Sequence, residues 1–444
     1  VRSLYILSGT LNYEGSNLLG RSRTARWLPT WNISGRWNVT NEHFLPATHA
    51  LSNLSFRLSY GLIAGLNNIG NALPIMISTI TPRFRNQDNE RLIRILSLQN
   101  SDLTWEKVYE TNFGTDIGFL SNAISLSVDL YQKNSKDLLD IVRTSGMGGE
   151  LNKYANDASM TTRGVELVLD TRNFKTEDFT WSTSVNFAYF KQEITSLANA
   201  SNSVFNLVRE TGGNVLGNPR NTLYSYDFAG LNSQGMPLLN LKGGSRDYKD
   251  IDFQDRDNIL SYLKKEGAVD PNITGGLSNT FRYKNWELNF LITMQAGNKI
   301  RKAPLYKGAG YDDLSVFPRE FKNRWVAPGD EALTQIPGIV SQRTLNEENK
   351  AYISRAYSAY NHSTARVVDG SFVRMKSISL SYTFDKEVLE NLNLGNLTLR
   401  LQASNPFLIY AHKDLNGQDP EFFRSGGVAY PITPQYTFTI NLGI

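Results

Sequence analysis

Five aspartates in one short stretch form the densest group of carboxylates in the sequence. Oxygen ligands at such spacing are typical of loops that bind Ca²⁺, but those loops need a glycine at their sharp turn. The centre of this stretch, Phe253-Gln-Asp-Arg256, has none. A solvated acidic loop is therefore the better interpretation, and a Ca²⁺ site in this loop is the alternative. The carboxylates are Asp247, Asp250, Asp252, Asp255 and Asp257.

The sequence shows no pattern of residues that indicates catalysis. The four histidines lie in predicted connections without a repeated ligand spacing. No glycine-rich phosphate loop and no serine-nucleophile elbow occurs between a strand and a helix. The sequence contains no cysteine, so thiolate chemistry is excluded. We expect no catalytic residues, no cofactor and no enzymatic activity. The histidines are His43, His49, His362 and His412.

Aromatic rings in the long connection 298–370 are the best candidates for binding. Such rings, set among Lys and Arg, offer flat surfaces for sugars or donors that read a peptide backbone. The alternative, which we favour, is that they pack the connection against itself or against a partner. The rings belong to Tyr306, Tyr311, Trp325, Tyr352, Tyr357 and Tyr360.

Strand-like segments flank the connections that contain these candidates, and residues 435–444 form the clearest of these segments. Apolar side chains alternate there with Thr437, Thr439, Asn441 and Gly443, as in a strand between one apolar and one polar environment. The apolar side chains are Tyr436, Phe438, Ile440, Leu442 and Ile444. About fourteen such segments occur: 4–13, 30–39, 54–60, 109–119, 124–130, 165–169, 179–189, 224–228, 237–241, 277–283, 286–294, 378–384, 397–403 and 435–444.

The connections between these segments alternate in length. Short ones lie near 40–52, 120–123, 171–178, 231–235, 284–285 and 385–396, and much longer ones separate them. Strict alternation is typical of an antiparallel transmembrane β-barrel with short periplasmic turns and long extracellular loops. A soluble β-sandwich, which would hide the apolar faces in a core, has no reason to keep this parity. The sequence therefore predicts an all-β outer-membrane barrel.

The polar faces of the strands fit a water-filled lumen. Arg36, Arg57 and Arg400 occupy them, and ionised groups are costly in a dry core. We expect these arginines to line the lumen, where they pair with neighbouring carboxylates or with a domain inside the barrel.

Composition agrees with a barrel in the cell envelope. The chain has 444 residues with 21 Tyr, 22 Phe and 7 Trp, enough for aromatic girdles at two membrane interfaces. No run approaches the roughly 18 apolar residues of a transmembrane helix. The net charge of +4 is small and no basic cluster occurs, which argues against a nucleic-acid partner.

Several blocks, in order along almost the whole chain, resemble the barrel of SusC-like (RagA-like) TonB-dependent transporters. No single block is decisive, but their order makes chance agreement improbable. The blocks include Asn12-Tyr-Glu-Gly-Ser16, Arg26-Trp-Leu-Pro-Thr-Trp31, Leu51-Ser-Asn-Leu-Ser-Phe-Arg-Leu-Ser-Tyr-Gly61, Arg163-Gly-Val-Glu166, Arg324-Trp-Val-Ala-Pro-Gly-Asp330, Asp369-Gly-Ser-Phe-Val-Arg-Met-Lys376, Ser404-Asn-Pro406 and Asp419-Pro-Glu421.

The resemblance implies a Bacteroidetes-type outer-membrane barrel of about 22 strands, of which residues 1–444 would form the C-terminal portion. The family's N-terminal extension, TonB box and plug have no counterpart here. Family members work with a SusD-like surface lipoprotein that closes over the barrel, and with TonB. They import oligosaccharides or peptides. Outer-membrane lipid, including lipopolysaccharide, and the barrel-assembly machinery are further implied partners, and the 435–444 strand would be the assembly signal.

Three functions follow as hypotheses. We favour a SusC-like importer acting with a lipoprotein lid. The second is a SusC-like barrel that serves as a structural or assembly subunit of a larger outer-membrane complex. The third is a self-closing porin, in which residues 4–13 would pair with residues 435–444.

Overall fold

The computed structural model consists mainly of β-strands, with short helices in the connections. It describes residues 4–20, 22–66, 72–82, 89–143, 145, 152–197, 204–245, 247–251, 258–306, 317–341, 343, 350–390, 394–421 and 433–443. Within these ranges, no helix combines the length and the apolarity needed to cross a membrane. Contacts divide the chain into two compact units, described separately below: unit 1 comprises 1–171, 188–201 and 215–218, and unit 2 comprises 172–187, 202–214 and 219–444.

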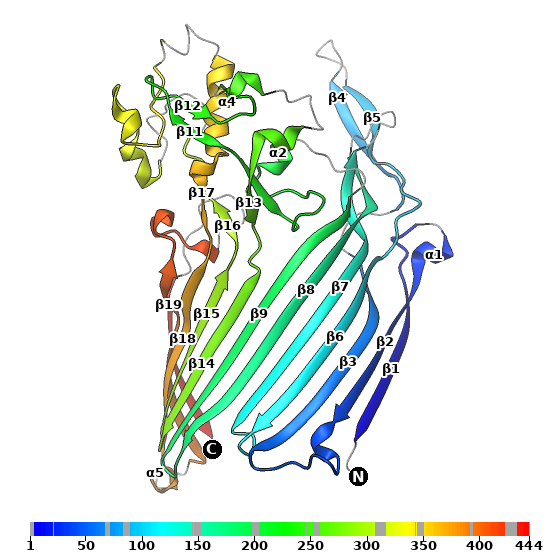
Figure 1. The fold of residues 1–444 in the computed structure, drawn as a ribbon, viewed down its shortest axis with the longest axis vertical. Coiled ribbons are helices and arrows are strands. Elements are labelled where there is room, and N and C mark those ends of the chain that lie inside the picture. Colours follow the sequence, from blue (N-terminus) through cyan, green and yellow to red (C-terminus); the bar gives the residue numbers. More distant parts are fainter. Residues whose placement is uncertain are drawn as a thin grey trace. The chain divides into compact units, whose positions relative to one another are not determined.

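In the part of the chain that the structure describes, twelve strands form one antiparallel sheet (Figure 1). Neighbours in this sheet follow one another along the chain once the small hairpins in the connections are left out. This connectivity confirms the predicted all-β, up-and-down architecture. The order is β1 (Tyr5–Gly15), β2 (Trp27–Asn38), β3 (Leu51–Gly65), β6 (Glu106–Phe119), β7 (Ile124–Arg143), β8 (Asn152–Lys175), β9 (Phe179–Leu197), β14 (Ile273–Tyr283), β15 (Trp286–Ala296), β18 (Phe372–Thr383), β19 (Asn396–Ala411) and β20 (Gln435–Gly443).

The prediction of about fourteen strands in the barrel is wrong by two. Segment 224–228 yields β10 (Thr222–Tyr226), which pairs with β13 (Leu263–Ala268) outside the large sheet. Segment 237–241 yields β12 (Pro237–Leu239), which pairs with β11 (Phe228–Leu231). Every residue of β10 is buried, and a strand of five residues is too short to span a bilayer at about 9–11 residues. Because two strands are lost together, the parity of the connections is kept.

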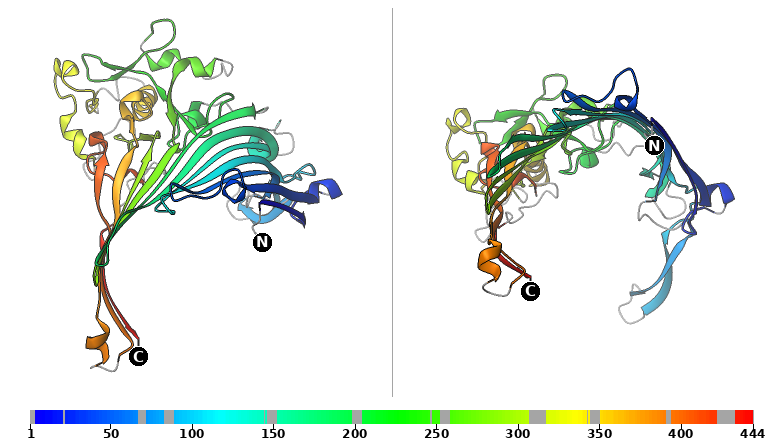
Figure 2. Two further views of the ribbon diagram at one scale, coloured as in Figure 1. Left: turned by 60° about the horizontal axis from the view of Figure 1, so that its bottom comes forward. Right: turned by 90° about the horizontal axis from the view of Figure 1, so that it is seen from below.

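Tight turns join the strands at one end of the sheet. Leu120, Ser121 and Asn122 between β6 and β7 have φ of 52°, 54° and 60°, and Lys284 between β14 and β15 has φ of 49°. Long connections lie at the other end, which is extracellular in barrels of this kind. In unit 1, the hairpin of β4 (Ile75–Pro82) and β5 (Asn89–Ser97) extends beyond β3 and β6, as Figures 1 and 2 show.

The pleat of unit 1 separates an apolar outer face from a polar inner face. Tyr5 lies opposite Trp37, and Trp37 lies opposite Phe56, all on the outer face. Leu7 is 82% exposed and Leu58 is 58% exposed. A continuous surface of large exposed apolar side chains fits lipid, not water.

Unit 2 repeats this pattern on the last strands. Leu399 lies opposite Ile440 and Leu401 lies opposite Phe438 in the β19–β20 ladder. Tyr436, Phe438, Ile440 and Leu442 are all exposed, and Ile444 lies outside the described residues.

The connections of unit 2 fold around the helix α4 (Lys350–Asn361). The short strand β17 (Val367–Asp369), which follows α4 in the chain, pairs with β16 (Lys299–Arg301). The other short elements are α1 (Arg23–Arg26), η1 (Val39–Asn41), α2 (Val204–Leu207), η2 (Tyr248–Asp250), η3 (Ile259–Tyr262), η4 (Arg319–Asn323), η5 (Asp330–Ala332), η6 (Thr364–Arg366), α5 (Lys386–Glu390) and η7 (Lys413–Leu415).

Candidate functional site

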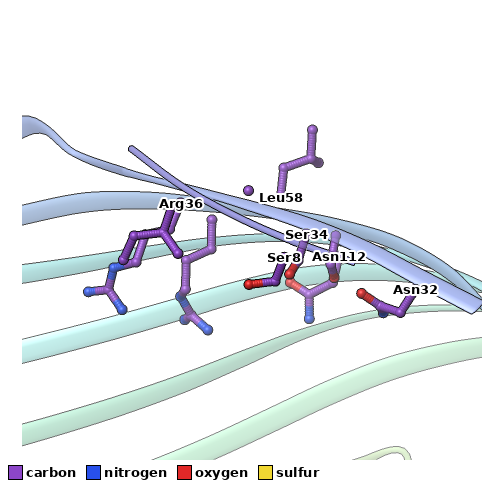
Figure 3. A pocket seen from close by; sticks show the side chains of 10 residues that line it. Ser8, Asn32, Ser34, Arg36, Leu58 and Asn112 are labelled. Atoms are coloured by element: carbon purple, nitrogen blue, oxygen red, sulfur yellow. The ribbon is translucent and has the colours of Figure 1, made fainter. Parts of the chain in front are cut away.

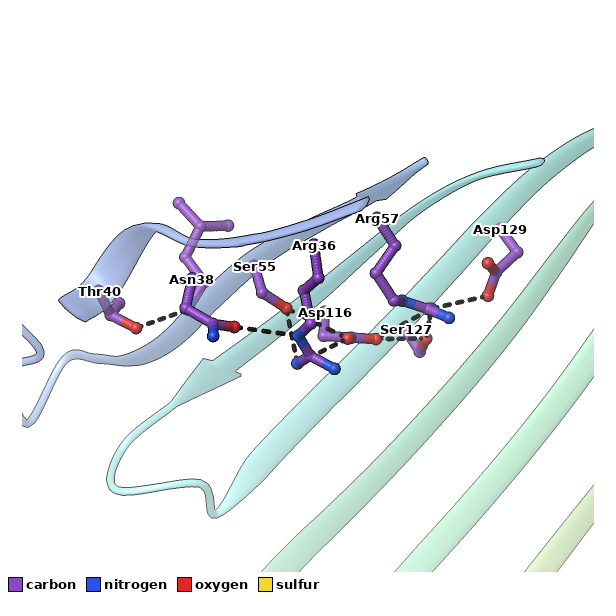
Figure 4. Close-up of polar contacts among 9 residues, drawn as sticks. Arg36, Asn38, Thr40, Ser55, Arg57, Asp116, Ser127 and Asp129 are labelled. Atoms are coloured by element: carbon purple, nitrogen blue, oxygen red, sulfur yellow. Dashed lines mark hydrogen bonds and ion pairs between the residues drawn. The ribbon is translucent and has the colours of Figure 1, made fainter. Parts of the chain in front are cut away.

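Two arginines and two aspartates from four adjacent strands form a charged network on the inner face of unit 1 (Figure 4). Asp116 on β6 forms ion pairs with both Arg36 of β2, at 3.2 Å, and Arg57 of β3, at 3.1 Å. Arg57 also reaches Asp129 of β7 at 3.1 Å. The network is neutral, with two cations and two anions. Of the three arginines predicted for the lumen, two are therefore paired with neighbouring carboxylates.

A glycine makes room for this network. Gly114 lies between Arg57 and Asp129 in the cross-strand register. A Cβ at Gly114 would overlap Oδ1 of Asp129 and come within 2.9 Å of Arg57 Nη2. The ion pair therefore passes directly over the glycine. The side chains are only partly shielded, at 38% exposure for Arg57 and 22% for Asp129, so each pair contributes about 1 kcal/mol or less.

Hydroxyl groups complete the network. Ser55 Oγ accepts a hydrogen bond from Arg36 Nη2 at 2.9 Å and donates to Asp116 at 3.2 Å. Ser127 Oγ donates to Asp116 at 2.8 Å. These short side chains hold the carboxylate in place without reducing the polarity of the wall.

A hollow of about 420 Å³ adjoins the network on the inner face (Figure 3). Its polar lining comes from one cross-strand row and its neighbours: Ser8, Asn32, Ser34, Arg36, Arg57, Ser59 and Asn112. Among the described residues, the buried Nε of Arg57 has no hydrogen-bond partner. Hydroxyl, amide and guanidinium groups together can bind neutral polar groups such as sugar hydroxyls or peptide carbonyls.

Arg400, the third predicted lumen residue, belongs to β19 of unit 2. It faces Ser381 on one side and Thr439 on the other. Within the described residues it forms no ion pair, so its role stays a prediction.

The rings predicted for binding lie in two different environments. Tyr306, Tyr357 and Tyr360 are buried in one cluster with Leu305, Phe321 and Ile353. Tyr357 Oη donates to Gly338 O at 2.6 Å, and the Tyr306 and Tyr357 rings meet edge to face at 4.9 Å. Burial raises the pKa of Tyr360 to about 12. These three rings pack the connection internally.

The remaining rings lie closer to the surface of unit 2. Trp325 Nε1 donates to Glu331 at 2.9 Å, and Tyr352 Oη donates to Asp247. Both are partly exposed, so they are the members of the predicted set that a ligand could reach. Tyr311 lies outside the described residues.

The acidic stretch is described only at its start. Asp247 caps the 3₁₀ helix η2 and Asp250 accepts from Ser245 Oγ. Asp252, Asp255 and Asp257 lie outside the described residues. No group of three metal-ligating residues occurs elsewhere in the described ranges. The Ca²⁺ alternative stays a prediction.

Sequence reasoning missed a buried charged cluster in unit 2. Glu320 forms ion pairs with both Lys302, at 2.8 Å, and Arg366, at 2.6 Å. The Arg366 side chain is only 1% exposed. Arg301 is also buried; its guanidinium donates to Tyr224 O at 2.7 Å and to Ser225 Oγ at 3.0 Å, and burial lowers its pKa to about 10. The pairing depends on long-range folding, and no local signal in the sequence marks it.

Two of the family-like blocks meet in a second buried ion pair. Arg374, in the Asp369–Lys376 block, is paired with Asp419, in the Asp419–Glu421 block, and its Nε lies 3.3 Å from Glu421. Arg374 and Asp419 are almost completely buried. The contact fixes the connection after β19 to the first residues of β18.

The sheet, its apolar outer face and its polar inner face define a β-barrel protein of an outer membrane. Residues 5–292 match the family described as TonB dependent receptor-like, beta-barrel. The chain therefore belongs to this family. Its place is the bacterial outer membrane, as predicted.

The chain is similar in sequence to TonB-dependent receptors, including a SusC. The chain is 26% identical to TonB-dependent receptor P39 of Formosa agariphila, over 97% of this chain and 43% of that protein. It is 25% identical to TonB-dependent receptor SusC of Bacteroides thetaiotaomicron, over 99% of this chain and 42% of SusC. The chain thus spans less than half the length of these relatives.

The solved structure of the RagAB peptide transporter shares the fold. It superposes with a TM-score of 0.78 at 23% identity, over 99% of this chain and 46% of that chain. The predicted TonB-dependent barrel family is thus confirmed, with SusC among the relatives in sequence and the RagAB transporter among the relatives in fold.

Proposed function

We propose that residues 1–444 form the C-terminal portion of the barrel of a TonB-dependent importer, which takes up oligosaccharides or peptides together with a SusD-like lipoprotein lid. The plug, the TonB box and the N-terminal extension lie outside this chain in the proposal. The observation that carries it is the inner wall of unit 1, where serine, asparagine and arginine side chains of four strands surround a hollow of about 420 Å³.

The chemistry of that wall supports a polar, uncharged cargo. Arg36 and Arg57 are already neutralised by Asp116 and Asp129, so neither guanidinium presents an uncompensated positive charge to a cargo. Its hydroxyl and amide groups exchange hydrogen bonds with water at little cost, and they do the same with a hydrated solute. A peptide or an oligosaccharide offers many such groups along its length.

The test is uptake by cells. A strain that lacks the complete protein is supplied with fluorescent oligosaccharides or peptides, and the strain that carries it is compared with and without TonB. The proposal predicts uptake that requires both the protein and TonB, and co-purification of a SusD-like lipoprotein. Unchanged uptake after deletion would refute it.

The second candidate is a structural subunit of a larger outer-membrane complex. It is favoured by the observation that the wall charges and the rings Tyr306, Tyr357 and Tyr360 are engaged in internal contacts. Normal uptake in the deletion strain, together with co-purification in a stoichiometric assembly, would support this candidate over the importer.

A further inference from the structure

The outer face of unit 1 changes from apolar to polar at one level across its strands. Leu58, Phe113, Leu130 and Val165 form the last apolar cross-strand row on β3, β6, β7 and β8. The next row towards the long connections is Tyr60, Thr111, Gln132 and Arg163. Because side chains two residues apart on a strand share a face, both rows lie on the same outer surface. The polar row, which begins with Tyr60, marks the edge of the hydrocarbon layer on the extracellular side.

Cations gather just above this edge. Lys107 of β6 lies opposite Lys136 of β7, and Arg163 lies on the neighbouring strand β8. Asp137 pairs with Lys107 at 2.6 Å. Within the described part of the chain, no carboxylate lies at ion-pair distance from Lys136 or Arg163. On β9, Lys191 and Glu193 continue the outer face with one charge of each sign, so Lys136 and Arg163 are the cations of the patch that have no ion-pair partner among the described residues.

Neighbouring side chains hold these cations in place. Arg163 Nε donates to Gln132 Oε1 at 3.0 Å, and Gln132 Nε2 donates to Asn134 Oδ1 at 3.3 Å. Thr161 Oγ1 donates to the same oxygen at 3.2 Å. Since Arg163 uses only Nε in this chain of bonds, its two terminal nitrogens stay available for an anion.

The second cation is placed by an aromatic ring. Lys136 Nζ lies 5.6 Å from the centre of the Tyr109 ring, within reach of a cation–π contact. A hollow of about 400 Å³ opens beside it, lined on the outer face by Tyr60, Tyr109, Asn134, Lys136 and Thr161. The hollow thus combines cationic, hydroxyl and amide donors immediately above an apolar band.

We propose that this patch binds the phosphorylated headgroup of a glycolipid in the outer leaflet, with Arg163 and Lys136 on a phosphate and the acyl chains along Leu58, Phe113 and Leu130. Two facts select this occupant. The net positive charge matches a phosphate, and guanidinium and ammonium groups are its usual ligands. The patch is also continuous with the lipid-facing band, so a molecule bound here has its tails in the hydrocarbon layer.

Native mass spectrometry of the complete outer-membrane protein, in detergent, tests the proposal. The protein is titrated with a bisphosphorylated glycolipid, with the same glycolipid after dephosphorylation, and with inorganic phosphate alone. We expect the bisphosphorylated glycolipid to bind preferentially. Lys136→Gln and Arg163→Gln should each weaken its binding about fivefold, the effect of one basic residue at an anionic membrane surface.

A matched control comes from the other end of the same strand. Arg172→Gln combined with Lys175→Gln removes two exposed cations at the turn end of β8 and should leave binding unchanged. Heat-modifiable electrophoretic mobility checks that every variant is a folded barrel. Equal binding of the dephosphorylated glycolipid, unchanged binding in the Lys136/Arg163 double variant, or preferential binding of free phosphate would each overturn the proposal.

Discussion

Arg57 and Asp129, on strands that are not adjacent, form a 3.1 Å ion pair across Gly114. The strand between them, β6, contributes a glycine at the crossing point and Asp116 two residues further on, which accepts the same guanidinium. The inner wall is thus braced across β3, β6 and β7 by side chains alone. The brace neutralises both guanidinium groups within the wall, as an uncharged cargo requires.

Gly114→Val should break this brace. The new side chain would occupy the space of the Asp129 carboxylate and the Arg57 guanidinium, and both can move aside because they are flexible. We expect a loss of about 1 kcal/mol in the free energy of unfolding, the scale of a partly exposed pair. Urea-driven unfolding of the complete protein in detergent measures it.

Gly35→Val on β2 is the matched control. Nothing lies within 4 Å of a Cβ at Gly35, which faces outward. This variant should be neutral or slightly stabilising, because β-branched residues favour strands. Equal destabilisation by both variants would show that strand propensity, and not the ion pair, sets the effect.

The second prediction concerns the pH dependence of the extracellular connection around Glu320. Burial alone would raise the pKa of Glu320, but Arg366 and Lys302 hold it below the usual 4.5. A carboxylate with a lowered pKa stabilises the fold above its unfolded pKa, and this contribution is lost as the pH falls through its folded pKa. We therefore expect the connection 298–370 to stay closed at pH 5 and to open as the pH falls below about 4.5.

Limited proteolysis with pepsin, read by mass spectrometry, measures this opening. Glu320→Gln should open the connection even at pH 5, since loss of one partner of a buried ion pair costs about 3–5 kcal/mol. Cleavage of the variant should then depend less on pH than cleavage of the wild type. Identical pH profiles for both proteins would contradict the assignment.

The third prediction separates packing from binding at Tyr357. Tyr357→Phe leaves the buried carbonyl of Gly338 without its donor and should destabilise the connection by about 1–3 kcal/mol. Tyr357→Ala should cost about 3–5 kcal/mol, as for other large-to-small changes in a core. Leu333→Ala, at an 85% exposed position, is the control.

Proteolysis of the same connection measures these costs, alongside an uptake assay. If Tyr357 instead contacted the cargo, Tyr357→Ala would reduce uptake while protease resistance stayed at the wild-type level.

The alternation of apolar and polar residues was enough to predict the architecture, because a strand between lipid and water must alternate. It was not enough to count the strands. Tyr224 and Tyr226 alternate as a barrel strand does, yet β10 is buried on both faces, and only its length distinguishes it. The hairpin β4–β5 was missed for the opposite reason: Ile75, Met76 and Ile77 are consecutive and do not alternate.

The contacts of the candidate sites depend on register, which the sequence leaves open. Arg36 and Arg57 were placed on the polar face correctly, but their shared partner Asp116 follows from a ladder that joins residues far apart in the chain. The same holds for Glu320 and Arg366, 46 positions apart. The sequence alone shows where a charged residue lies, whereas its ion-pair partner is decided by the fold.

The last prediction concerns the two faces of β20. Phe438 is 59% exposed on the face it shares with Tyr436 and Ile440. If this face meets lipid, Phe438→Lys should cost about 2–4 kcal/mol near the bilayer midplane and reduce the folded fraction in the outer membrane. Thr437→Lys puts the same charge on the opposite face, next to Gln402, where water is available, and should assemble normally.

The folded fraction is measured by heat-modifiable electrophoresis of outer-membrane preparations. Equal assembly of the two variants would mean that the apolar face of β20 does not meet lipid, and that Tyr436, Phe438, Ile440 and Leu442 are covered by protein instead.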